Sequence, residues 1–347
     1  MRRHVYQRSK GGSILVPMEL RAQLIGGSNT PKLCKIVSWK YAHLSAGLVS
    51  EDMGLNHGRP ISCKLIQSIS HHVSEIAIDH EFEWQYELPY FNSVVTHIGI
   101  GRDGTTSAIR GDGYRETMCG TLSFYNSQGE RLHTTYTACA PQYGKKTFDT
   151  VLDMEIEQAK QQFPLAVYVG IADGAKDNWT YLHPHTSVSV LDYFHATEYL
   201  SDVSIVLKKD KLKQKEWFEG ACHDLKHDKK GAKYLLREMI DFRDNLNKLN
   251  KLNKLNKIGK EIPETLSRTI TYFENNVGRM QYAKYIKKGY PIGSGVTEAA
   301  CKVVVKQRLN LSGMKWNIDT AQQMLVLRGL VCTTGRWEQF WKHFDRQ

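Results

Sequence analysis

Residues 94–172 decide the fold, because within them the hydrophobic pattern changes from helical spacing to short strands. Four strand-like stretches follow one another: VVTHIGI (94–100), ETMCGTLSFY (116–125), RLHTTYTA (131–138) and LAVYVGIA (165–172). The second and third alternate in polarity and are joined by turn residues, so the first three predict a three-stranded meander. Residues 146–162 have the apolar spacing of an amphipathic helix. The predicted order is three strands, a helix and a strand, with another strand at 188–192.

On the N-terminal side of this segment, residues 31–78 carry three short helical patterns. Pro31 is placed to open the first helix, and the second covers residues 46–56. The turn HGRP (57–60) then leaves Ser62 as the N-cap of the third helix. This arrangement predicts a helix-turn-helix, although a purely structural helical bundle would show the same pattern.

The third of these helices has two chemically distinct faces. Its apolar stripe consists of Leu65, Ile66, Ile69 and Val73. The opposite face carries Lys64, Gln67, Ser68 and His71, whose side chains suit phosphates and base edges. We therefore predict that Lys64, Gln67 and His71 contact DNA.

Residues 201–290 lose strand character and become Lys-rich and helical in pattern, which indicates an all-helical insertion. Within it, Leu-Asn-Lys occurs four times in a row at 246–257. A triplet repeat keeps no constant face on a helix of 3.6 residues per turn, so we expect a solvated extension whose length is tolerated. After the insertion, PIGSG (291–295) predicts a turn, and residues 296–309 predict a helix.

Composition and length limit the class of protein. A chain of 347 residues with 41% hydrophobic and 10% aromatic residues predicts a globular protein of two or more domains. No stretch approaches the about 20 apolar residues of a membrane helix, so we expect no membrane association and an intracellular location. The seven cysteines include no CxxC pair, which predicts reduced thiols and no disulfide framework.

The net charge of +11 is unevenly distributed. It is +6 for residues 1–78, −8 for 79–200, +9 for 201–290 and +4 for 291–347. Basic segments on both sides of an acidic middle suggest a polyanion held by the flanks. The acidic middle would repel phosphate unless it bound a cation. Chance variation of charge between domains is the alternative.

Three carboxylates stand where secondary structure would make them converge. Asp103 follows the first predicted strand, Asp173 follows the fourth, and Glu298 lies in the first turn of the helix after the insertion. Carboxylate oxygens favour Mg²⁺ or Mn²⁺, and two such ions support phosphoryl transfer. We therefore predict a two-ion site that acts on DNA. Taken singly, the aspartates also fit Asp-Gly turns, and Glu298 also fits a favourable helix dipole.

Three ordered blocks resemble a known family. IADGAKDNW (171–179), LDYFHATEYL (191–200) and GYPIGSGVTEAACKVVVKQRLNLSGMKW (289–316) resemble the insertion-sequence transposases of the ISKra family. The resemblance extends from about residue 15 to RWEQFW (336–341). It implies a DDE transposase with a ribonuclease-H-like mixed sheet and flanking helices, interrupted by a helical insertion. Its catalytic and metal-binding triad would be Asp103, Asp173 and Glu298, holding two Mg²⁺ or Mn²⁺ ions.

The resemblance also assigns supporting residues. Asp192 and His195 match a D-x-x-H element of this family and of the similar Mutator-like transposases. We expect them to support the site rather than to bind metal, with a buried structural pair as the alternative. Lys302, Lys306 and Arg308, on the helix of Glu298, are candidates to hold the DNA backbone.

The predicted organisation combines these regions. A basic segment (1–30) precedes the helix-turn-helix (31–78), a catalytic domain (79–200 plus 291–330) is interrupted by the insertion (201–290), and a C-terminal segment (331–347) follows. Members of the family commonly carry a longer, often cysteine-rich N-terminal portion, which suggests that this chain derives from a truncated element.

The expected activity is cleavage at the ends of an insertion sequence, followed by attack of the freed 3′-hydroxyl on target DNA. The expected partners are double-stranded DNA of the terminal repeats and of the target, bound by several copies of the chain near the nucleoid in the bacterial cytoplasm. Two alternatives stay open: a catalytically inactive DNA-binding derivative, and a metal-dependent nuclease of the same fold.

Overall fold

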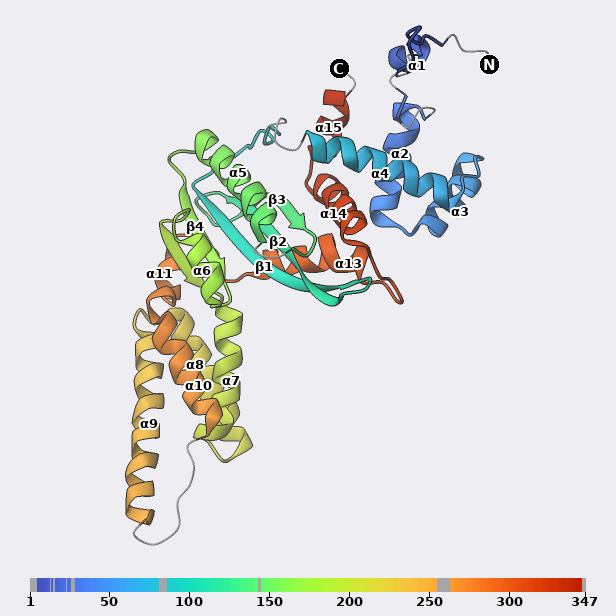
Figure 1. Cartoon of the computed structure of the whole chain (residues 1–347). Helices are drawn as coiled ribbons and strands as arrows, with labels where there is room; N and C mark the ends of the chain where they lie inside the picture. Colours follow the sequence, from blue (N-terminus) through green and yellow to red (C-terminus); the bar gives the residue numbers. More distant parts are fainter. Residues whose placement is uncertain are drawn as a thin grey trace.

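The computed structural model describes residues 5–12, 14, 16–22, 24–25, 29–80, 86–142, 145–254 and 263–344. Its centre is a five-stranded mixed sheet with the strand order β3-β2-β1-β4-β5 (Figure 1). The strands are β1 (His97–Ile109), β2 (Gly113–Tyr125), β3 (Arg131–Cys139), β4 (Val167–Ala172) and β5 (Val188–Leu191). β1 to β3 form an antiparallel meander, whereas β4 and β5 run parallel to β1. The predicted α/β class and the predicted order of strands are confirmed.

The first strand differs from its prediction. It begins at His97 and continues to Ile109, well beyond the predicted end at residue 100. The second half of β1 contains small and polar residues, and two of them are buried in the sheet, because Thr105 and Ser107 lie under the covering helices. Thr117 of β2 donates a hydrogen bond of 3.0 Å to the Ser107 hydroxyl, so the buried polar atoms are paired. This polarity concealed the strand in the sequence.

Helices cover both faces of the sheet. α5 (Lys146–Gln162) and α6 (Lys176–Leu182) lie on one face. The other face is covered by one helical run, α12 (Gly295–Ala300), the π-helical turn η3 (Cys301–Lys306) and α13 (Gln307–Leu309), together with α14 (Ile318–Cys332) (Figure 1). α5 has the bounds that the sequence predicted. Val304, Val305 and Leu309 point into the core, also as predicted from the apolar positions of residues 296–309.

The predicted three helices of residues 31–78 are present. They are α2 (Pro31–His43), α3 (Ala46–His57) and α4 (Cys63–Asp79), preceded by the short α1 (Pro17–Arg21). Ser62 caps α4 as predicted, accepting a hydrogen bond from the Leu65 backbone N–H. One prediction on α4 is wrong: Leu65 is 39% exposed, because the packing face of the helix runs through Ile66, Ile69 and Val73.

These N-terminal helices share a hydrophobic core with the C-terminal end of the chain. α4 packs against α14, and α15 (Arg336–Phe344) adds Trp337, Phe340 and Trp341 to the same buried cluster. α14 also crosses the predicted boundary between residues 330 and 331. The helices α2 to α4 are thereby anchored to the layer of helices that covers the sheet.

The predicted insertion is helical, and its helices form an arm that extends away from the sheet (Figure 1). This helical arm comprises α7 (Tyr193–Leu207), α8 (Lys211–His227), α9 (Gly231–Lys254), α10 (Glu264–Asn276), the 3-10 turn η2 (Val277–Arg279) and α11 (Tyr282–Lys287). α7 begins directly after β5, so the predicted boundary between residues 200 and 201 falls inside a helix. Among the helices that the structure describes, none has the length and apolar character needed to cross a membrane.

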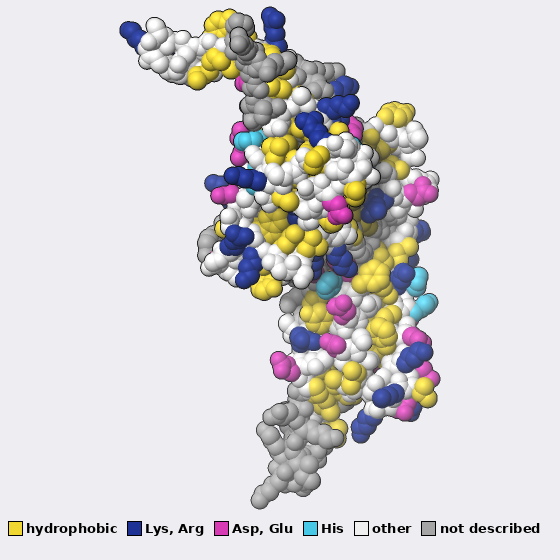
Figure 2. All heavy atoms as spheres, turned by 90° about the vertical axis from the view of Figure 1, so that its right-hand side faces the viewer, with side chains coloured by type: hydrophobic (Ala, Val, Ile, Leu, Met, Phe, Trp, Pro, Cys, Tyr) yellow, Lys and Arg dark blue, Asp and Glu magenta, His cyan; other side chains and the backbone are white. Residues whose placement is uncertain are grey.

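The charged side chains on the helical arm are distributed differently from those on the rest of the molecule. On the face shown in Figure 2, Lys and Arg side chains are spread over the upper part of the molecule, and acidic and basic side chains alternate over the helical arm. The mixed arm surface is typical of solvated helices that carry ion pairs, such as Lys215 with Glu219 and Arg268 with Asp202.

The Leu-Asn-Lys repeat forms the far end of α9, up to Lys254, and its last copy (255–257) lies outside the described residues. Leu249 is 54% exposed, whereas Leu246 at the start of the repeat packs against the hydrophobic core. We expect deletion of residues 252–257 to leave soluble protein and to change the thermal midpoint by less than about 2 °C. As a control, Met239→Ala in the buried part of α9 should cost about 2–5 kcal/mol. Loss of soluble protein after the deletion would show that the repeat is structural.

Candidate functional site

Asp103 lies inside β1, two residues beyond the last residue pair that joins β1 to β4, which is Gly101 with Ile171. The prediction that Asp103 follows the strand is therefore wrong, although its position at the edge of the parallel pairing is retained. Side chains alternate along a strand. Arg102 points to the opposite face, where it is buried and pairs with acidic residues of α5 and α6.

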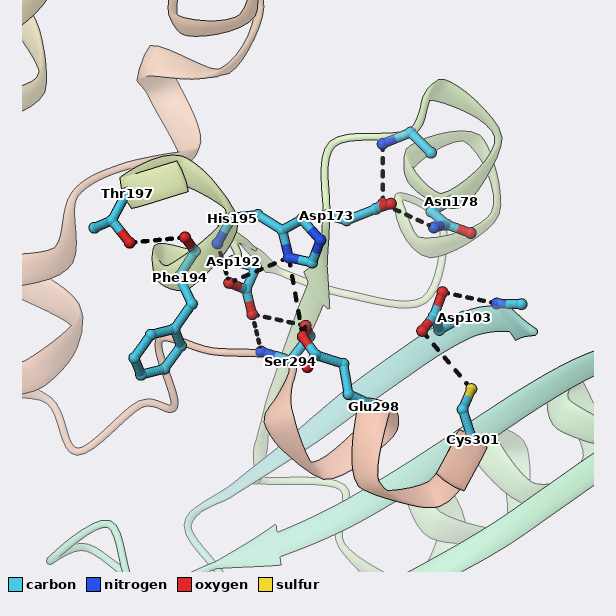
Figure 3. A network of polar contacts seen from close by, with 12 residues as sticks. Asp103, Asp173, Asn178, Asp192, Phe194, His195, Thr197, Ser294, Glu298 and Cys301 are labelled. Atoms are coloured by element: carbon cyan, nitrogen blue, oxygen red, sulfur yellow. Dashed lines mark hydrogen bonds and ion pairs between the residues drawn. The ribbon is translucent and has the colours of Figure 1, made fainter. Parts of the chain in front are cut away.

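The Asp103 carboxylate is half-buried under the helical run that contains Glu298. One oxygen, Oδ1, accepts a hydrogen bond of 2.7 Å from the Gly104 backbone N–H. The other, Oδ2, lies 3.7 Å from the Cys301 thiol, which donates to it from η3 (Figure 3). The carboxylate is thus oriented from both sides and faces the region between β4 and α12.

Asp173 directly follows β4, as predicted. Its Oδ1 accepts hydrogen bonds from the Ala175 backbone N–H at 3.1 Å and from Asn178 Nδ2 at 3.2 Å. Gly174 has a positive φ of 106°, which permits the sharp turn from β4 into α6. The Tyr272 hydroxyl donates to the Asp173 backbone carbonyl at 2.9 Å. The turn that carries Asp173 is therefore held by the helical arm as well as by α6.

Glu298 reaches the sheet because α12 packs unusually closely on β1. A Cβ atom at Gly101 would lie 1.8 Å from Thr297 Oγ1, so only glycine fits at that position. Thr297 is also tied to β2 by a hydrogen bond of 2.8 Å between its hydroxyl and that of Thr121. Since Glu298 is the next residue, this contact sets its distance from β1. Its Oε1 accepts a hydrogen bond of 2.9 Å from Ser294 Oγ.

A buried polar network holds Glu298 from the other side. Asp192 is fully buried and caps α7, accepting a hydrogen bond of 2.8 Å from the His195 backbone N–H. Its other oxygen, Oδ2, accepts from the backbone N–H of Ser294 and from Ser294 Oγ, the latter at 2.6 Å. The single hydroxyl proton of Ser294 is donated to one carboxylate at a time, so Ser294 couples Asp192 to Glu298. The network is drawn in Figure 3.

His195 lies between these acidic groups. Its Nδ1 is 3.6 Å from Asp192 Oδ1 and 3.9 Å from Glu298 Oε1, and the atom is buried without a hydrogen-bond partner in the described structure. Asp192, His195 and Glu298 each place a ligand atom within 4.8 Å of the others. Within the described residues, this is the group of three whose ligand atoms all lie that close together. The carboxylate oxygens of Asp103, Asp173 and Glu298 do not all lie within 4.8 Å of one another in the described structure.

The predicted trio nevertheless shares one electrostatic environment. Burial raises the pKa of the Asp103 carboxyl above its usual range, and the negative charges of Asp173 and Glu298 raise it further. Like charges raise a carboxyl pKa more strongly when they are near it in a poorly solvated region. Figure 3 shows Asp103, Asp173 and Glu298 around the same region, carried by β1, the end of β4 and α12.

The donor set fits a divalent metal ion. In the part of the chain that the structure describes, no Lys or Arg forms an ion pair with Asp103, Asp173 or Glu298, so their negative charge is not balanced by the protein. Carboxylate oxygens are the ligands that Mg²⁺ and Mn²⁺ prefer. Both oxygens of Asp192 are already occupied as hydrogen-bond acceptors, so this residue fits the predicted supporting role better than a ligand role.

The residues predicted to contact DNA fall into two places. Lys64 and Gln67 are exposed near the start of α4, and His71 is partly exposed one turn further. Lys302 and Lys306 are exposed on η3, one and two turns after Glu298. All five are accessible to a DNA backbone, as their predicted role requires.

Arg308 differs from this prediction. It is 2% exposed, and its Nε donates a hydrogen bond of 3.0 Å to the Tyr41 carbonyl of α2. The guanidinium lies over the rings of Tyr41 and Trp316, at 4.7 and 5.1 Å from their centroids. Burial lowers the pKa of Arg308 from its usual value. Its position supports a structural role, joining α2 to the helices that cover the sheet, and leaves almost no surface for phosphate.

We expect Arg308→Met to reduce the free energy of unfolding by about 1–3 kcal/mol, because it leaves the buried Tyr41 carbonyl without a donor. Chemical denaturation measures this loss. The neighbouring exposed variant Lys306→Met should show the reverse behaviour, with unchanged stability and weaker DNA binding. Unchanged stability of Arg308→Met would contradict the structural role.

Several contributors to the site were missed in the sequence. Ser294 was interpreted only as part of the turn at 291–295, yet its side chain joins two carboxylates. The spacing of Ser294 and Glu298, one helical turn apart, was the available signal. The contacts of Cys301 with Asp103 and of Thr297 with Gly101 had no such signal, because they depend on tertiary packing.

Comparison of the chain with models of known protein families, and with curated proteins, found no match. The arrangement of the carboxylates is therefore the main indication of what the protein does.

Proposed function

We propose that this protein is a metal-dependent DNA transposase of the DDE type, built on a ribonuclease-H-like sheet. One observation carries the proposal: three carboxylates from the middle of β1, the end of β4 and the first turn of α12 lie in one region without compensating cations in the described structure. Such a set suits divalent ions and phosphoryl transfer.

The arrangement of the sheet supports this proposal. An antiparallel meander followed by two parallel strands, in the order β3-β2-β1-β4-β5, agrees with the ribonuclease-H-like sheet that the resemblance implies. The helical arm is inserted between β5 and α12, which is where the resemblance places an insertion before the glutamate.

Each side chain has a definable role in this chemistry. Asp103, Asp173 and Glu298 would hold the ions, which when bound supply an activated nucleophile and stabilise the leaving oxygen of a phosphodiester. Ser294 and Asp192 fix the position of Glu298, and His195 fills the space between them. Preorganisation of this kind matters because a displaced ligand weakens every interaction with the reacting group.

DNA would be held by groups around the site. Lys302 and Lys306 lie on the same helical run as Glu298 and would attract the phosphate backbone. Lys64 and Gln67 on α4 would contact a duplex farther from the chemistry, as in a helix-turn-helix. The corresponding partners are the terminal repeats and target DNA, with assembly of several copies on paired ends at the bacterial nucleoid.

The proposal is tested by incubating the protein and Mg²⁺ with labelled duplexes taken from the DNA that flanks the coding region. We expect strand cleavage at the element end and a covalently joined product with a target plasmid, both abolished by EDTA. Cleavage without joined product would favour a metal-dependent nuclease. Binding without cleavage would favour a DNA-binding derivative.

A further inference from the structure

A cavity of about 1000 Å³ opens directly beside Asp173, between α6, α7 and α10. Its wall begins at Gly174, the residue after the aspartate, and includes Trp179 of α6 and Tyr272 of α10. Tyr272 connects the two sites, because its hydroxyl donates to the Asp173 carbonyl at 2.9 Å. The cavity therefore adjoins the carboxylates but is formed largely by the helical arm.

Guanidinium groups are fixed on aromatic rings along this cavity. Arg279 lies over Trp179, 4.5 Å from the ring centroid, and its Nη1 donates to Asn276 Oδ1 at 3.1 Å. Tyr199 and Tyr272 stack at a centroid distance of 3.9 Å. The contacts with Trp179 and Asn276 hold Arg279 in one orientation before any ligand binds, which reduces the entropy lost on binding.

Arg279 is also a cation without a counter-ion. In the described part of the chain no carboxylate forms an ion pair with it, and the same holds for Lys176 at the cavity wall. Arg268, by contrast, is neutralised by Asp202 at 2.8 Å. An unpaired, preoriented guanidinium suits a phosphate group.

The exposed face of α10 adds uncharged hydrogen-bonding groups. Ser267, Thr271 and Asn275 are spaced four residues apart, are exposed, and line the cavity together. This spacing places them in one row along the helix. Hydroxyl and amide groups can both donate and accept hydrogen bonds, so they can bind base edges and sugar oxygens.

We propose that this cavity binds an unpaired nucleotide of the DNA strand whose phosphodiester lies at the carboxylates, with Arg279 on its phosphate. This inference rests on the proposed function for the substrate but concerns a separate set of residues. Trp179 and Asn276, which are 8% and 4% exposed, form the buried part of its wall, and exposed side chains of α6 and α10 form the rest. A base stacked inside a duplex cannot enter such a cavity, whereas a base that has left the helix can.

The test measures binding of a fluorescent single-stranded oligonucleotide to the full chain in EDTA, so that cleavage plays no part. We expect Arg279→Gln to weaken binding about tenfold, and to reduce the dependence of log affinity on log salt by about 0.7, the value for one phosphate contact on a single strand. The matched control Arg237→Gln, an exposed arginine of α9 outside the cavity, should change affinity less than twofold.

Further measurements make the result decisive. Arg279→Lys should retain part of the affinity. The thermal midpoints of all variants should agree, which would show that the weaker binding comes from a lost contact with DNA and not from unfolding. A fully paired duplex should bind Arg279→Gln and the unmodified protein equally. The inference is overturned if Arg279→Gln binds single strands normally, or if it loses duplex binding equally.

The two proposals can fail separately. Metal-dependent cleavage with normal single-strand binding by Arg279→Gln would remove the cavity inference and leave the transposase proposal. If Arg279→Gln loses single-strand affinity but the unmodified protein cleaves no DNA, the cavity inference stands and the transposase proposal is removed.

Discussion

Replacement of Asp173 by asparagine is expected to abolish metal-dependent DNA cleavage while leaving the fold and DNA binding nearly unchanged. The amide keeps an oxygen that can accept from the Ala175 N–H and from Asn178, so the turn after β4 should persist. What is lost is the negative charge that would hold a divalent ion. A loss of about 4 kcal/mol of transition-state stabilisation corresponds to about 10³-fold in rate, and we expect at least that.

Two quantities are measured: the initial rate at which a labelled duplex is cleaved at saturating Mg²⁺, and the dissociation constant of the same duplex from the protein in EDTA. Asp177→Asn is the matched control, because Asp177 is a neighbouring acid whose exposed carboxylate pairs with Arg102 and Lys145 and not with the site. It should cleave at nearly the normal rate. Undiminished cutting by Asp173→Asn would remove this residue from the catalytic site, and with it the DDE assignment.

Regular elements could be predicted from the sequence where local pattern and tertiary environment agree. α5 is amphipathic, with Phe148, Leu152 and Ile156 on its buried side, and its predicted and observed bounds coincide. β1 was predicted too short because its second half buries threonine and serine, which local hydrophobicity does not identify as core. Ser107 is stable there because its hydroxyl accepts a hydrogen bond from Thr117 of the neighbouring strand β2.

Long-range contacts could not be predicted in this way. Arg308 has the spacing of a solvated basic residue, but the approach of α2 buries it between two aromatic rings. Gly101 resembles any glycine in a strand, and only the packing of Thr297 against it shows why a side chain is excluded. The convergence of Asp103 and Glu298 depends on that contact. Strand order suggested the convergence, but the contact that produces it is visible only in the folded chain.

The link between Asp192 and Ser294 carries the second large expected effect. Asp192 is fully buried and accepts three hydrogen bonds, two of them from Ser294. Asp192→Ala would leave these donors unsatisfied, at about 1–3 kcal/mol for each buried group, so we expect extensive loss of folded protein. Removal of the Ser294 hydroxyl alone is the more informative change, because the backbone N–H of Ser294 continues to bond Asp192.

We therefore expect Ser294→Ala to remain folded, with a cleavage rate or Mg²⁺ affinity lowered by about 10–100-fold, as is typical when a group that orients a metal ligand is removed. Titration of cleavage with Mg²⁺ distinguishes this role from simple destabilisation, since a displaced Glu298 should require more Mg²⁺ for half-maximal rate at an unchanged thermal midpoint. Ser312→Ala, at an exposed serine after the same helical run, serves as the control. A normal Mg²⁺ requirement in Ser294→Ala would mean that Glu298 is positioned by the packing of Thr297 on Gly101 alone, and that the buried Asp192 network serves the junction between α7 and α12 instead of the chemistry.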